Sequence, residues 1–243
     1  MRLAGLDLRN LTRGPWPGVL AVSAAGWAAL AALECSSLGA AICSATPVIL
    51  RLWSPQRLAE QSLLWSLMVL AMAPPLLAPA IHRLWTVSLA RRRPRAVAAF
   101  AIGYALIWIT AGLVLYPAAL TLALVLKPLG VFGVVVAVLP ALIWQASPAK
   151  QTCLNRCHYQ PCLAPFGLAA DCDALRYGLV SGLWCLGACW VLMLTPLVIG
   201  AAHLALMAVA ALALLAERGR RSRPAVWRLP GGGLLRRWRR NDG

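Results

Sequence analysis

Long apolar stretches constrain this chain more than any other feature, because most of its length can be soluble only inside a bilayer. Of the 243 residues, 61% are hydrophobic and 12% charged. A helix needs roughly 20 apolar residues to cross the hydrocarbon core. We therefore predict an all-α fold, a polytopic transmembrane helix bundle of about six spans at residues 17–33, 62–81, 96–116, 128–145, 177–199 and 200–216.

Arginine placement predicts the orientation of this bundle. Basic residues follow the second span between Arg83 and Arg95, and nine arginines lie between Arg218 and Arg240. Loops rich in Arg and Lys stay in the cytoplasm, so both termini should be cytoplasmic. The net charge of +16 is thus explained by topology, and we predict the lipid bilayer and no nucleic acid as a partner. The expected organisation is one membrane domain, 1–216, with a cytoplasmic Cys-rich loop at 146–176 and a basic, disordered tail at 217–243.

Sulfur-containing residues recur at a spacing of four, which places them on one face of a helix. Cys185 and Cys189 are followed four residues later by Met193. The same interval recurs in three further pairs: Met68 with Met72, His203 with Met207, and Cys153 with Cys157. Soft thiolate and thioether ligands favour Cu(I), and imidazole is compatible with them. We predict that these residues bind a metal ion, most simply Cu(I), inside the membrane, except Cys153 and Cys157, which belong to the predicted cytoplasmic loop.

The expected depths of these donors form a ladder. Met68, Met193 and Met207 should lie roughly 5 to 10 Å below the outer surface at a rise of 1.5 Å per residue, with His203 nearer water. Cys189 and Met72 should lie near the middle of the membrane, and Cys185 nearer the inside.

The ladder would lead to the expected cytoplasmic loop, whose donors are Cys153, Cys157, His158 and Cys162, followed by Cys172. The cytosol would keep these thiols reduced. Their spacing lacks the paired CxxC knuckles of a zinc ribbon, although a structural zinc site stays open as the alternative. On the opposite side, Cys35 and Cys43 can form a disulfide.

Three prolines, Pro74, Pro75 and Pro79, follow Met72 in the second span. Proline removes an amide donor and frees a carbonyl in the preceding turn. Two interpretations stay open: a broken helix that lines a cavity, or a kink whose carbonyls are satisfied by neighbouring helices.

These residues carry a family resemblance. The positions are Trp65, Met68, Met72, Pro75 and Pro79; Trp144, Gln145, Ser147, Pro148, Lys150, Cys153, Leu154 and Cys157; and Gly178, Gly182, Cys185, Gly187, Cys189, Trp190, Leu192, Met193, Gly200, Met207 and Glu217. The chain resembles the bacterial predicted metal-binding integral membrane proteins, domain of unknown function 2182, over most of 62–218. The resemblance implies a metal-related role in the bacterial inner membrane. Ala188 departs from the family pattern, which has a cysteine there, and His203 stands where asparagine is common.

The leading hypothesis is a non-enzymatic membrane protein that binds, conducts or delivers Cu(I), with a membrane enzyme or a metallochaperone as partner and a homo-oligomer as a further option. No P-loop is present to couple ATP. One alternative is a thiol oxidoreductase, although thiols four apart on a helix suit shared metal ligation better than a disulfide. The other is an assembly subunit that packs through small residues such as Gly178 and Gly182.

Overall fold

The computed structural model describes residues 15–34, 55–164, 166–200, 203–220 and 222–227, and every regular element in them is helical. The all-α prediction is confirmed for this part of the chain, while Cys35 and Cys43 lie outside it. The elements are α1 (Trp16–Glu34), α3 (Pro55–Val87), η2 (Ala90–Arg92), α4 (Arg93–Leu126), η3 (Lys127–Leu129), α5 (Gly130–Ala146), α6 (Pro148–Arg156), α7 (Gly167–Ile199) and α8 (His203–Arg218).

Four helical stretches in the described residues are long and apolar enough to cross a membrane, judged by length and composition. They are 16–33, 59–87, 90–146 and 167–199, and the third comprises α4, η3 and α5. α8 adds 16 residues. The number of spans and the orientation of the termini stay predictions.

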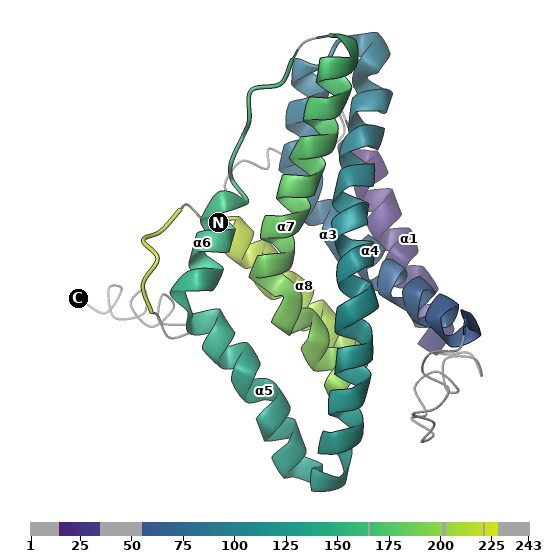
Figure 1. Ribbon diagram of the computed structural model, residues 1–243, viewed down its shortest axis with the longest axis vertical. Coiled ribbons are helices and arrows are strands. Elements are labelled where there is room, and N and C mark those ends of the chain that lie inside the picture. The colour runs from purple at the N-terminus through teal and green to yellow at the C-terminus, as the bar shows by residue number, and fades with distance from the viewer. Residues whose placement is uncertain (1–14, 35–54, 165, 201–202, 221, 228–243) are drawn as a thin grey trace.

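The centre of the molecule is formed by α4 and α7, which run side by side, with α3 packed against α4 (Figure 1). α4 and α7 approach each other through glycines: a Cβ at Gly178 would collide with the backbone carbonyl of Phe100, and one at Gly103 with that of Leu175. Small residues allow membrane helices such close backbone contact. The long α4–α7 interface thereby fixes the orientation of the α7 face that carries Cys185 and Cys189.

α1 packs along α3 at the proline-rich segment. Pro75 cannot donate to the carbonyl of Ala71, and the hydroxyl of Ser23 on α1 donates to that oxygen at 2.5 Å instead. Gly26 permits this approach, since a Cβ there would lie 2.8 Å from the amide nitrogen of Ala71. α3 is continuous from Pro55 to Val87, so the structure favours a proline-containing helix supported by its neighbour over a broken helix.

The helices extend beyond two of the predicted spans. α4 continues past Pro117 to Leu126, because η3 and Gly130, with φ of 55°, form the turn instead. α7 begins at Gly167, ten residues before the predicted start of that span. Much of the predicted 146–176 loop is therefore helical, with Cys153 on α6 and Cys172 on α7.

The remaining elements, α5, α6 and α8, bring the chain back against α7. α5 diverges from the lower end of α4 and leads into α6, which lies beside the middle of α7 (Figure 1). Ser147 begins α6 as its N-cap, accepting a hydrogen bond from the amide of Lys150, with Pro148 in the first turn. α8 ends on the same side as α6, so short helices bring two chain segments against the centre of one long helix.

Candidate metal centre

The two thiols of α7 are buried beside α4. Cys185 and Cys189 are each 2% exposed. The Tyr104 hydroxyl of α4 donates to Cys185 Sγ at 3.2 Å, and Cys189 Sγ donates to the Cys185 carbonyl at 2.9 Å. Both thiols thus face the protein interior, as the four-residue spacing predicted.

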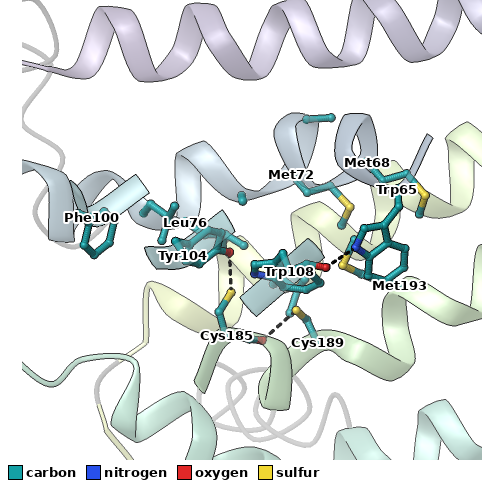
Figure 2. Close-up of a cluster of buried hydrophobic side chains, with 14 of the residues drawn as sticks. Trp65, Met68, Met72, Leu76, Phe100, Tyr104, Trp108, Cys185, Cys189 and Met193 are labelled. Atoms are coloured by element: carbon teal, nitrogen blue, oxygen red, sulfur yellow. Dashed lines mark hydrogen bonds between the residues drawn. The ribbon is translucent and has the colours of Figure 1, made fainter. Parts of the chain in front are cut away.

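The methionines extend this interior surface in both directions. Met68, Met72, Met193 and Met207 belong to the same buried core cluster as the α7 thiols. Met68 and Met72 project from α3 toward α7, and Cys185, Cys189 and Met193 project from α7 toward α3 (Figure 2). Sulfur atoms from two helices therefore line one strip of the core, with Met207 added by α8. We call these six side chains the sulfur stripe: Met68, Met72, Cys185, Cys189, Met193 and Met207.

Aromatic rings separate the two sides of the sulfur stripe. The Trp65 indole donates to the Trp108 carbonyl at 2.7 Å, and its ring covers Gly112, where a Cβ would collide with it. Trp108 also stacks at a tilt against Trp65 and Tyr104. Sequence reasoning treated α4 only as an apolar span and missed the rings of Tyr104 and Trp108. The four-residue spacing of Tyr104, Trp108 and Gly112 was the available signal.

α6 brings a second pair of thiols to α7. Cys153 packs at Gly187, where a Cβ would lie 2.8 Å from Cys153 Sγ. Cys157 ends α6, and burial raises the pKa of its thiol to about 12. Burial likewise raises the pKa of Cys153. Both thiols are therefore protonated at neutral pH unless a cation or a metal ion displaces the proton.

Arg218, the last residue of α8, connects these two groups of thiols. One guanidinium nitrogen donates to the Leu76 carbonyl of α3 at 2.8 Å, and the other to Cys157 Sγ at 3.2 Å. Its charge also acts on Cys185 and Cys189. The sequence presented Arg218 only as the first of the tail arginines, so its place among the thiols was not predicted.

A buried ion pair fastens α6 to α8 beside this site. Lys150 Nζ lies 2.6 Å from Glu217 Oε2, and Gln145 donates to the other carboxylate oxygen at 3.5 Å. Lys150 is 1% exposed, and its burial lowers the pKa of the ammonium although Glu217 opposes this effect. The pair holds Cys153 and Cys157 close to α7.

The other predicted ligands are exposed or lie at the start of α8. His158 is exposed just after α6, and Cys162 and Cys172 are exposed as well. His203 begins α8, where its Nε2 is buried and has no hydrogen-bond partner among the described residues. Nowhere in the described ranges do three His, Cys, Asp or Glu side chains converge as a metal site. The predicted four-donor loop cluster therefore stays a prediction, whereas the thioethers and thiols of the sulfur stripe share one core.

Comparison with known proteins adds one match. A family model described as PpoB2, copper chaperone, matches residues 62–237. The chain belongs to this family. No curated protein and no solved structure matches it. At the level of the family, the match supports a non-enzymatic role and copper as the metal. The resemblance to the family called domain of unknown function 2182 stays a prediction.

In this PpoB2 family member, the match begins in α3 and includes every residue of the sulfur stripe, together with Arg218 and α6. It leaves out α1, which contributes Ser23 to the proline segment of α3 but no sulfur to the core. The part of the chain that belongs to the family is therefore the part that carries the candidate donors.

Proposed function

We propose that this protein is a membrane-embedded copper chaperone that holds Cu(I) as cargo on the sulfur stripe and delivers it to a copper-requiring partner. Cys185 and Cys189 would be the principal ligands, and Met72, Met68, Met193 and Met207 would supply thioethers along the path. His203, whose Nε2 has no hydrogen-bond partner among the described residues, would serve as a ligand at the start of α8.

The observation that carries this proposal is the shared burial of two thiols and four thioethers in one core, formed by the candidate membrane helices α3 and α7 together with α8. Such soft donors select Cu(I) over harder metal ions. The donors come from α3, α7 and α8, so several weak positions along a strip are available rather than one closed coordination sphere. Weak, successive positions suit a protein that must release its metal.

Geometry favours this role over thiol redox chemistry. Cys185 and Cys189 lie one turn apart on a regular helix, and Cys189 Sγ points to the backbone carbonyl of Cys185. A disulfide needs a specific Cβ–S–S–Cβ geometry that a regular helical turn does not offer to both thiols. Cys153, Cys157, His158 and Cys162 would be receiving ligands on the α6 side, and zinc at that loop is the alternative.

The test is Cu(I) binding by the detergent-solubilised protein, purified under reducing conditions and titrated against a chromogenic Cu(I) chelator. We expect stoichiometric Cu(I) in the wild type and in Cys172→Ser, which replaces an exposed thiol outside the proposed ligand set. Cys185→Ser/Cys189→Ser should lose it. Equal copper binding by Cys172→Ser and Cys185→Ser/Cys189→Ser would refute the assignment of the site to α7, and zinc retained by both would favour the α6 side.

A further inference from the structure

Arg218 is a partly buried cation to which the described residues offer no carboxylate. The neighbouring Glu217 is already paired with Lys150, whose Nζ lies 2.6 Å from Glu217 Oε2, and Asp171 is paired with Arg92 and Arg95. The guanidinium instead donates to a backbone carbonyl and to a thiol. A buried charge normally has a partner of opposite charge, so this environment is incomplete.

The groups around the guanidinium are those that a soft metal would make anionic. Cys157 is a direct hydrogen-bond partner, and Cys185 and Cys189 interact with the same charge. A metal ion binds the thiolate form of cysteine, so binding releases the thiol protons. One Cu(I) held by two thiolates carries a net charge of −1, and a fixed cation beside it lowers the energy of that complex.

We propose that Arg218 is a positioning residue that supplies the positive charge for thiolate-bound Cu(I), and that it lies at the junction where copper passes from the α7 thiols to Cys157. This inference rests on the proposed function and adds to it a residue and a route. Arg218 lies at the junction because its guanidinium donates to Cys157 Sγ while its charge acts on Cys185 and Cys189.

The transfer is a ligand exchange that balances without an oxidant. The bond from Cu(I) to Cys189 Sγ breaks as a bond to Cys157 Sγ forms. The proton of the Cys157 thiol passes to the released Cys189 thiolate. Copper stays Cu(I) throughout, two thiolates hold it before and after, and the charge that Arg218 compensates is unchanged.

The experiment compares three purified proteins, wild type, Arg218→Gln and Arg218→Lys, by competition for Cu(I) with a chromogenic chelator. We expect Arg218→Gln to weaken Cu(I) binding at least about tenfold and Arg218→Lys to stay within about threefold, since lysine keeps the charge. Arg220→Gln removes an exposed charge two residues away and should not change the affinity. The unfolding temperatures of the two Arg218 variants should fall by similar amounts, because both lose the guanidinium that hydrogen-bonds the Leu76 carbonyl and Cys157 Sγ at once.

An equal loss of affinity in Arg218→Lys and Arg218→Gln, or no loss in either, would overturn the charge-compensation role. If Arg218→Gln does not fold, the lysine variant alone decides, because a tenfold loss there contradicts the proposal. These results are separable from failure of the proposed function, in which wild-type protein itself binds no Cu(I) or Cys185→Ser/Cys189→Ser binds it as well as wild type.

Discussion

The Lys150–Glu217 ion pair should be one of the most sensitive polar contacts in the protein, and the two residues should respond unequally to substitution. The Lys150 side chain is 2% exposed and that of Glu217 is 22% exposed. Removing Glu217 leaves an ammonium that water cannot reach, and breaking a buried pair in this way costs about 3 to 5 kcal/mol. Removing Lys150 leaves a carboxylate that can still draw on solvent, so Lys150→Met should cost about 1 kcal/mol.

The magnitude translates into a measurable shift. For a chain of 150–250 residues, 1 kcal/mol corresponds to about 2 to 4 °C in Tm, so Glu217→Gln should lower Tm by about 6 °C or more. The double variant Lys150→Met/Glu217→Gln removes the stranded charge together with its partner. It should therefore be more stable than Glu217→Gln alone, by about 2 kcal/mol.

The assay is thermal unfolding in a mild detergent, followed by tryptophan fluorescence. Arg95→Gln is the matched control, because Arg95 is 66% exposed and Asp171 keeps its second partner, Arg92. That control should change stability by less than about 1 kcal/mol. A Glu217→Gln protein as stable as Arg95→Gln, or a double variant no better than Glu217→Gln, would refute the view that the buried ammonium determines the cost.

Three further predictions concern packing, the proline segment and pH. Gly178→Ala should cost about 1 to 3 kcal/mol, because the new Cβ meets the Phe100 carbonyl, whereas Gly18→Ala meets nothing within 4 Å and should be neutral or slightly stabilising; thermal unfolding compares the two. Ser23→Ala leaves the Ala71 carbonyl without a hydrogen-bond donor and should cost about 1 to 2 kcal/mol of stability. Ser66→Ala is the control, because the Ser66 hydroxyl donates only to the Ser62 carbonyl in its own exposed helix turn; equal Tm values for the two variants would contradict the prediction. Stability should fall between about pH 9 and pH 12. The unfolded chain loses the Cys157 proton near the ordinary pKa of 9.0, whereas the buried thiol of the folded protein keeps its proton up to a pKa of about 12. In Cys157→Ser, the free energy of unfolding should change less steeply with pH across this range.

Local spacing made the sulfur stripe predictable. Residues four apart on a helix share a face whatever the helix packs against, so Cys185, Cys189 and Met193 could be grouped from the sequence alone. The same rule applied to Met68 and Met72. That these two groups belong to one core is a tertiary fact, and it depends on where α3 and α7 meet along α4.

The polar part of the site could not be predicted in the same way. Lys150 and Glu217 are 67 residues apart in the sequence, and Arg218 and Cys157 are 61 residues apart. In the sequence, each of these charged residues resembles an interfacial charge that fixes topology. Hydropathy also assigned 146–176 to a loop, because α6 is short and polar. Its capping residue, Ser147 before Pro148, was the local signal that a helix begins there.

Helix length explains why these charges meet the thiols. α5 and α8 have 17 and 16 residues, about 25 Å each, whereas α7 has 33 residues and about 50 Å, more than the roughly 30 Å hydrocarbon core. Near its end α5 reaches α7 at Gly187, where the Trp144 indole donates to the backbone carbonyl, and α8 ends beside Cys157. If both short helices cross the membrane, their common end marks a boundary on α7 close to Cys185. The sulfur stripe would then end where Lys150 and Arg218 begin, so copper that reaches Cys185 and Cys189 would be one ligand exchange from leaving the bilayer.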